Sequence, residues 1–433
     1  MARRWLRAWL LTAVAFGGAS LIVPLYLVEL GGTAFDLGIL FATSSFVGVP
    51  GALVFGGLAD RTGKRRVFVL VAMVTTVVSM LAIPALENRS LVIVVHALLW
   101  LGYAAAIPVL TLLVVSGEAE NVWTDLIGRL NKSQGIGWSL GLLIGFAVIS
   151  VGATQVSTIL AQRLFFLVCA ASAGAGFVLA LRTLPADSAS GEGPSPQRLR
   201  RRVHRAASFN VRGAAFPFSP GRFDPRRLHP RRFAQRFTSG LALYFLAVVV
   251  VFTGFGVFFA PLPAYLTGVG YSSSEIFALY LVLNVVAAAF YGPATGLVRR
   301  YDVIPVHLGG LLVRGGVLPA VAVVGTLIGG TIAGNVVVAF FFVCLGLSWA
   351  VIALTAARIV TDLTPAVIRG EALGVFGALV ALGGGFGGLL GGWLATFGFT
   401  TTFGFAGGLV VVGAGIVVVL DRRFHRKPSS GFG

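Results

Sequence analysis

The chain has 433 residues, of which 57% are hydrophobic and only 11% are charged. Soluble proteins carry about 25% charged residues, so this composition excludes a cytosolic globular enzyme. Its high hydrophobicity also excludes a disordered or low-complexity protein. Two cysteines, Cys169 and Cys344, are too few for a disulfide framework, and both lie in apolar runs where we expect inert packing.

Long apolar runs recur along the whole chain, each close to the roughly 20 residues that cross a bilayer as a helix. They are apolar throughout rather than alternating, so they predict helices and not the strands of a barrel. The first run is too long for the core of a signal peptide and is interpreted as a span. Twelve spans are predicted, at 8–30, 37–58, 67–86, 91–115, 131–150, 163–181, 238–267, 274–298, 305–328, 334–357, 371–396 and 400–420.

The net charge of +18 raises the question of nucleic-acid binding, but the placement of the basic residues favours a signal for membrane topology. Twelve spans put both termini on one side, and basic residues gather there at Arg3, Arg4, Arg7, Arg422, Arg423, Arg426 and Lys427. The turns on the other side hold only Arg89 and Arg163. Both termini are therefore predicted to be cytoplasmic, in a multi-pass protein of the cell membrane, with the lipid bilayer and not nucleic acid as its partner.

A polar segment rich in arginine, proline and glycine separates six predicted spans from the other six. Its composition predicts a solvated linker, although interleaved phenylalanines would also suit an anionic membrane surface. The predicted domains are an N-terminal six-helix bundle at 1–181, a basic cytoplasmic linker at 182–237, a C-terminal six-helix bundle at 238–420 and a cytoplasmic tail at 421–433.

The two halves share an internal repeat, which is visible when the chain is aligned with itself at an offset of 239 residues. The identities pair Phe16 and Gly17 with Phe255 and Gly256, Pro24, Tyr26 and Leu27 with Pro263, Tyr265 and Leu266, Gly31 with Gly270, and Gly57, Leu58 and Arg61 with Gly296, Leu297 and Arg300. Two parallel repeats are a transporter architecture, in which the halves rock about a site at their interface.

The turn after the second span reads GGLADRTGKRR over residues 56–66. In such a tight turn Gly63 can take a left-handed conformation, and Asp60 is an acceptor suited to a helix N-terminus. This stretch resembles the G-x-L-A-D-R-x-G-R-K signature of the major facilitator superfamily, and the resemblance implies that Asp60 caps helix 11 as a conformational latch. The implied latch residues are Gly56, Asp60, Arg61, Gly63, Lys64, Arg65 and Glu371.

The resemblance implies two six-helix bundles related by a pseudo-two-fold axis and a monomeric secondary transporter that works by alternating access. The fifth span keeps the spacing of Gly137, Gly141 and Gly145 but lacks the proline of the drug-antiporter signature. The incomplete signature weakens the case for drug efflux. Efflux of a small organic solute is still the first hypothesis, and an uptake symporter or uniporter of a small metabolite is the alternative.

Polar and aromatic side chains within the spans are candidates for the substrate cavity, because a polar group in lipid must be paired or hydrated. Several share a helix face, as His96, Trp100 and Tyr103 do at i, i+4 and i+7. Alternatively, these residues have a structural role, in hydrogen bonds between helices or in the aromatic belts at the membrane interfaces. The residues expected to line a cavity for a weakly polar substrate are His96, Trp100, Tyr103, Gln134, Trp138, Tyr280, Asn284 and Trp349.

Buried charge is scarce, and no carboxylate occupies the middle of a span. His96 and Glu29 are therefore the first candidates for proton coupling, and uncoupled facilitated diffusion stays open. Arg314 lies well inside the ninth span, where we expect it to snorkel or to find a structural partner rather than to act in transport.

Enzymatic alternatives find little support, because no nucleotide-binding, metal-binding or nucleophile motif is present, and no cofactor or metal is predicted. A polytopic lipid enzyme would need paired catalytic groups near one interface. The nearest acidic residues lie in loops on opposite faces and are Glu87, Glu118, Glu120 and Asp125. A second rival is a non-transporting membrane sensor that signals through 182–237.

Overall fold

The computed structural model describes residues 4–62, 64–116, 118–119, 122–186, 238–329, 331–365 and 368–424, without the side chains of 49–61, 124, 370, 371 and 424. These residues form helices and no strands. The helices of the first half are α1 (Trp5–Glu29), α2 (Ala34–Thr62), α3 (Arg65–Ala82), α4 (Arg89–Val115), α5 (Trp123–Gln155) and α6 (Thr158–Thr183). Those of the second half are α9 (Ser239–Phe259), α10 (Leu262–Gly268), α11 (Ser273–Arg300), α12 (Val303–Ile328), α13 (Ile332–Asp362), α14 (Arg369–Leu394) and α15 (Phe399–Phe424).

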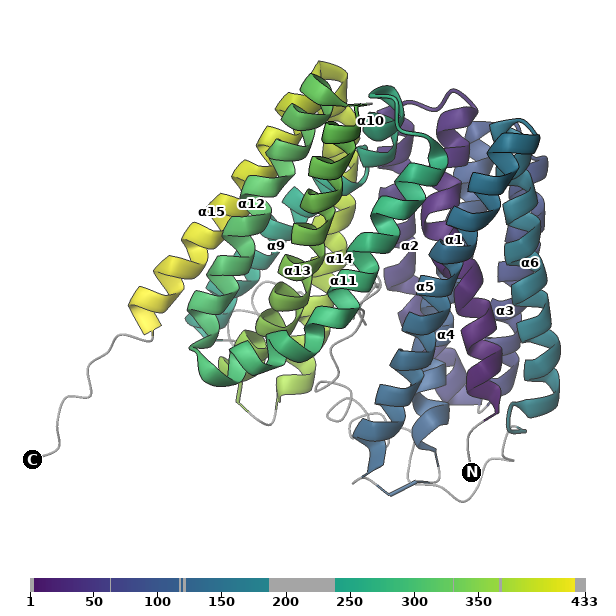
Figure 1. Cartoon of the computed structure of the whole chain (residues 1–433). Coiled ribbons are helices and arrows are strands. Elements are labelled where there is room, and N and C mark those ends of the chain that lie inside the picture. The colour runs from purple at the N-terminus through teal and green to yellow at the C-terminus, as the bar shows by residue number, and fades with distance from the viewer. Residues whose placement is uncertain are drawn as a thin grey trace, which may run out of the picture.

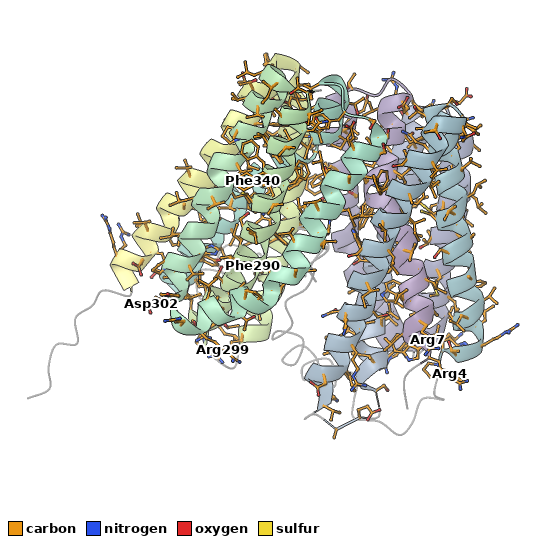
Figure 2. The ribbon with its side chains drawn as sticks, viewed as in Figure 1. Arg4, Arg7, Phe290, Arg299, Asp302 and Phe340 are labelled. Atoms are coloured by element: carbon orange, nitrogen blue, oxygen red, sulfur yellow. The ribbon has the colours of Figure 1, made fainter. Side chains whose placement is uncertain are left out.

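The described helices have the length and composition of membrane spans. Eleven of them are long and apolar enough to cross a bilayer, and α2 adds a shorter apolar stretch, Ala34–Gly48. Large apolar side chains cover the outside of the molecule, as Phe340 does on α13 with 61% of its surface exposed (Figure 2). Water would disfavour so much exposed apolar surface, whereas lipid solvates it. The predicted all-helical, polytopic fold is confirmed.

Several helices extend beyond the predicted apolar runs by about a turn or more. The fifth span was predicted at 131–150, and α5 continues to Trp123 and Gln155. At the other end of the chain α15 runs to Phe424, so the first residues of the predicted tail are helical. Most of the predicted linker and the rest of the tail lie outside the described residues.

The seventh span, predicted as one run over 238–267, is broken in two. Helix α9 ends at Phe259, and α10 begins at Leu262 after Pro261. Proline has no N–H to donate to the preceding turn, so a helix cannot continue through Pro261 and Pro263 without losing hydrogen bonds. The predicted seventh span is therefore present over Ser239–Gly268, and a joint lies within it.

The helices form two groups, which lie side by side in Figure 1. Helices α1 to α6 contact one another in the first group, and α9 to α15 do so in the second. The main contacts between the groups are those of α2 with α14 and of α5 with α11. The groups meet toward the end of the molecule that carries α10, whereas α1 begins at the opposite end (Figure 1).

The internal repeat appears in the structure as a pair of equivalent hydrogen bonds. The Tyr26 hydroxyl on α1 donates to Leu86 O at 3.0 Å. The matching Tyr265 hydroxyl on α10 donates to Ala322 O at 2.7 Å. Both bonds tie the end of the first span of a half to the end of its third, which explains why a tyrosine stands at both positions.

The same offset relates two glycines that turn the chain. Gly31 follows α1 with φ 76°, and Gly270 follows α10 with φ 96°. Residues with a side chain rarely adopt this left-handed conformation, so glycine is the residue expected at both helix ends. The repeat seen in the sequence therefore specifies turns as well as packing.

We expect Tyr265→Phe to lower the stability of the protein by about 1 kcal/mol, because it removes a buried hydroxyl while keeping the ring. Thermal unfolding of the purified protein in detergent measures the change. The matched control is Tyr301→Phe, whose side chain is 56% exposed, and it should leave the unfolding temperature unchanged. Equal effects of the two substitutions would contradict the role given to the Tyr265 hydroxyl.

Candidate functional site

A cavity with about 640 Å³ of empty space, part of it open to solvent, lies where the two halves meet. Its walls come from α1, α2 and α4 on one side and from α9, the α9–α10 joint, α10 and α11 on the other. The lining residues are Ser20, Pro24, Leu37, Leu40, Phe41, Ser44, Ser45, His96, Trp100, Phe259, Ala260, Pro263 and Tyr280. None of these side chains is acidic, and the imidazole of His96 is the one basic group.

Three of the residues expected to line a cavity, His96, Trp100 and Tyr280, do line this one. His96 and Trp100 stand one turn apart on α4, so their side chains meet. The Trp100 indole Nε1–H donates to His96 Nε2 at 2.8 Å. An indole N–H can only donate, so Nε2 must carry a lone pair, and the proton of a neutral imidazole is on Nδ1.

The Nδ1 atom of His96 is buried and finds no hydrogen-bond partner among the described residues. A buried donor without a partner raises the free energy of the protein by about 1–3 kcal/mol. A bound solute or a water molecule with an acceptor atom would remove that penalty. His96 therefore brings an unsatisfied hydrogen-bond donor to a side chain that lines the cavity.

Tyr103, Gln134 and Trp138 lie in the layer behind Trp100 and do not line this cavity. The rings of Tyr103 and Trp138 stand 5.4 and 5.9 Å from that of Trp100, centroid to centroid. Gln134 joins this layer, because its Nε2 donates to the Tyr103 hydroxyl and its Oε1 accepts from Trp9 Nε1 at 3.4 Å. These residues hold Trp100 in position, and the helical spacing alone could not separate that role from lining.

In the second half, Asn284 and Trp349 lie near the cavity wall but do not line it. Asn284 stands one turn beyond Tyr280 on α11, and its Nδ2 donates to Tyr280 O at 2.8 Å. Its Oδ1 is buried without a hydrogen-bond partner in the described part of the chain. Trp349 packs with Phe252, their ring centroids 6.3 Å apart.

Three serines in the wall are not among the predicted lining residues. Ser20, Ser44 and Ser45 donate their hydroxyl hydrogens to backbone carbonyls three or four residues earlier, at 2.7 to 2.9 Å. This local bonding consumes the proton and leaves oxygen lone pairs available. The adjacent pair Ser44–Ser45 in an otherwise apolar span was the available signal, but a serine that bonds to its own helix is also ordinary in lipid.

Glycine brings the two halves into backbone contact beside the cavity. A β-carbon on Gly38 of α2 would stand 2.6 Å from Gly388 O and 3.1 Å from Gly392 Cα of α14. We call Gly38, Gly388 and Gly392 the glycine contact. The glycine contact therefore lets the backbones of the two halves approach each other beside the cavity, where a larger residue would push them apart.

A second contact between the halves lies near the starts of α6 and α11. Gln162 Nε2 donates to Ser273 Oγ at 3.2 Å. Beside it the rings of Phe165 and Phe277 pack at right angles, their centroids 5.6 Å apart. Both contacts between the halves therefore involve residues near the helix ends that face α10.

Arg314 does not snorkel but has structural partners, which is the second of the two outcomes expected for it. The side chain is 1% exposed, and its guanidinium carbon stands 4.4 Å from the ring centroid of Phe255, 5.4 Å from that of Phe259 and 5.5 Å from that of Trp349. Its Nη1 donates to Leu345 O at 3.2 Å. Aromatic faces attract a cation, so the partners of this charge are rings.

The predicted latch lies at the turn between α2 and α3 and stays a prediction. The residues whose side chains lie outside the description are Gly56, Asp60, Arg61, Gly63 and Glu371. Lys64 is exposed and Arg65 is half-buried at the start of α3. Glu29, the other candidate for proton coupling, is exposed at the end of α1 and does not line the cavity.

An all-helical bundle with membrane-spanning helices and a cavity between two repeated halves is the architecture of a secondary transporter. The sequence profile of the Major Facilitator Superfamily matches residues 8–357 and 316–433. The chain therefore belongs to the major facilitator superfamily, whose members are transporters and not enzymes.

The chain is also similar to a protein of Bacillus subtilis (strain 168) named NiaP, provisionally described as a niacin/nicotinamide transporter, at 24% identity over 190 residues. That match covers 44% of this chain and 45% of the relative, so it spans about half the length of either protein.

Solved structures show the same fold over nearly the whole chain. The nucleoside transporter NupG has a TM-score of 0.71 at 13% identity, covering 97% of this chain and 99% of that one. A POT family transporter in complex with 5-aminolevulinic acid has a TM-score of 0.67 at 14% identity, covering 97% and 95%. Identities this low establish the fold alone.

Proposed function

We propose that this chain exports a small organic solute across the cell membrane by alternating access, with the cavity between the halves as its binding site. The observation that carries the proposal is that both halves supply the walls of one cavity. If the halves rock as rigid groups, a site shared between them opens first to one side of the membrane and then to the other.

The orientation follows from charge. Arg4, Arg7 and Arg299 lie at the end of the molecule away from α10 (Figure 2). Basic residues mark the cytoplasmic side, so we assign that end to the cytoplasm and the end that carries α10 to the outside. The glycine contact then closes the outer side, and the cavity belongs to an outward-closed state of the transport cycle.

The chemistry of the walls favours a compact, mostly apolar solute that carries a hydrogen-bond acceptor. Aromatic rings of Phe41, Trp100 and Tyr280 suit a planar body, and the Nδ1–H of His96 suits an acceptor atom. Niacin and nicotinamide, the compounds in the name of the relative NiaP, are compact heteroaromatic molecules with acceptor atoms. We propose a small heteroaromatic compound as the substrate.

Proton coupling is part of the proposal, with His96 as the proton carrier. Protonation would place a hydrogen on Nε2, which could then no longer accept the indole N–H of Trp100. Trp100 packs against Tyr103 and Trp138, so a change in its position would reach the layer behind it. Proton binding would thereby act on the wall that holds the solute.

The proposal is tested with purified protein in proteoliposomes after a thermal-shift screen of heteroaromatic solutes. A solute that stabilises the protein should be carried across the membrane, and an imposed pH gradient should drive it against its concentration gradient. Flux toward the cytoplasmic side of oriented protein would replace export with uptake. Absence of flux for every stabilising solute would refute the transport proposal.

We expect His96→Gln to abolish the acceleration of flux by a pH gradient while exchange without a gradient continues at a lower rate. Glutamine keeps donor and acceptor atoms but does not titrate near neutral pH. The measurement compares initial rates with and without the gradient. Trp393→Phe, at a 50% exposed position on α14, is the control and should retain the acceleration. A gradient response that survives in His96→Gln would exclude His96 as the carrier.

A further inference from the structure

The guanidinium of Arg314 is a buried charge that has no role in the proposed transport mechanism. It is the twelfth residue of α12, so it lies about 16 Å along the helix axis from Val303. The acidic residues that the structure describes, in contrast, stand at helix ends or in turns. Among these described residues no carboxylate reaches the depth of Arg314, and none forms an ion pair with it.

The groups around Arg314 compensate its charge only in part. Three aromatic faces and Leu345 O contact the guanidinium, while its Nε is buried and has no hydrogen-bond partner among the described side chains and backbone. A buried cation without a counter-ion is strongly unfavourable, and an apolar side chain of similar length would fill the same space without that penalty. A structural role alone therefore does not account for an arginine here.

Arg314 lies one ring away from the cavity. Phe259, the last residue of α9, lines the cavity and also stands 5.4 Å from the guanidinium carbon. The helix breaks directly after Phe259, so this ring belongs to the joint between α9 and α10. No lining residue carries a formal negative charge, so nothing in the cavity wall screens the positive potential of Arg314.

We propose that Arg314 makes the cavity selective for anionic organic solutes, such as carboxylates, by acting across the Phe259 ring. The inference rests on the proposed function and names the charge class of its substrate. The guanidinium supplies the counter-charge that the interior otherwise lacks, and the Nδ1–H of His96 supplies a hydrogen bond from the opposite wall. In a medium of low polarity, a unit charge about 8 Å from a bound anion raises the affinity of the site for that anion about tenfold or more.

The test compares acids with their amides, which have nearly the same shape but differ in charge. Nicotinate with nicotinamide, and benzoate with benzamide, are titrated against the purified full chain by isothermal calorimetry. The wild-type protein should bind the acid of at least one pair about tenfold more tightly than the amide. Arg314→Met should bring that ratio close to one, and Arg314→Lys should keep part of it. Arg358→Met, an exposed arginine paired with Asp362, is the control and should leave the ratio unchanged.

A second variant keeps the test decisive if Arg314→Met does not fold. Phe259→Ala removes the ring between the guanidinium and the cavity, so it should raise the ratio of acid to amide affinity further. The inference would be overturned if the wild-type ratio of acid to amide affinity were near one, or if none of the four compounds bound. It would also be overturned if Arg314→Met left that ratio intact or if Phe259→Ala lowered it. Flux of neutral solutes in proteoliposomes together with a ratio near one would overturn the inference while sustaining the proposed function.

Discussion

Gly38→Val should leave the protein folded but lower its transport rate about thirtyfold. Gly38 packs against Gly388 and Gly392 of the other half, so a side chain there obstructs the contact between the halves and not the packing inside either one. An obstruction of this kind disfavours the outward-closed state by about 2 kcal/mol. Such a shift changes the ratio of the two states about thirtyfold.

Two measurements separate a block of closure from loss of folding. Flux in proteoliposomes should fall, while the unfolding temperature should stay close to that of the wild type. A cysteine at Ser44, which lines the cavity, should react faster with an impermeant thiol reagent added from outside. Gly309→Val on α12, where a side chain would meet open space, is the control. Normal flux in Gly38→Val would show that the glycine contact need not close during transport.

Gly256→Ala should destabilise the protein by about 3 kcal/mol, because a single methyl group would clash inside the second half. A β-carbon at Gly256 of α9 would overlap Gly384 O and stand 2.8 Å from Gly388 N of α14. Backbone atoms cannot rotate away as a side chain can, so the two helices would have to separate. Thermal unfolding in detergent and the yield of monodisperse protein measure the effect.

The matched control is Gly415→Ala on α15, where nothing lies within 4 Å of the new methyl group. Alanine has the higher helix propensity, so this control should be neutral or slightly stabilising. Opposite signs for the same chemical change would show that backbone proximity, and not the loss of glycine flexibility, decides the outcome. A mild effect of Gly256→Ala would mean that α9 and α14 separate easily.

The fold could be read from the sequence because lipid imposes a simple requirement. Every span must be a helix with an apolar surface, so the apolar runs, their number and the repeat at offset 239 were visible without coordinates. The break at Pro261 was missed because the run stays apolar through it, and hydrophobicity alone does not show where a backbone hydrogen bond is lost.

The site was harder to predict because residues on one helix face can belong to different layers. His96, Trp100 and Tyr103 share a face of α4, yet only the first two line the cavity. Which residues reach the cavity depends on the positions of α1 and α5, which no periodicity in α4 encodes. Arg314 shows the same limit, since its depth in the span could be predicted but not the three rings that surround it.

The paired tyrosines and turn glycines separate the positions that the two halves share from those at which they differ. Tyr26 and Tyr265, like Gly31 and Gly270, recur because both halves need the same scaffold. His96, Trp100 and Tyr280, which line the cavity, are not among the shared identities. The repeated positions therefore belong to the scaffold, whereas the lining of the cavity is asymmetric, with different side chains contributed by each half.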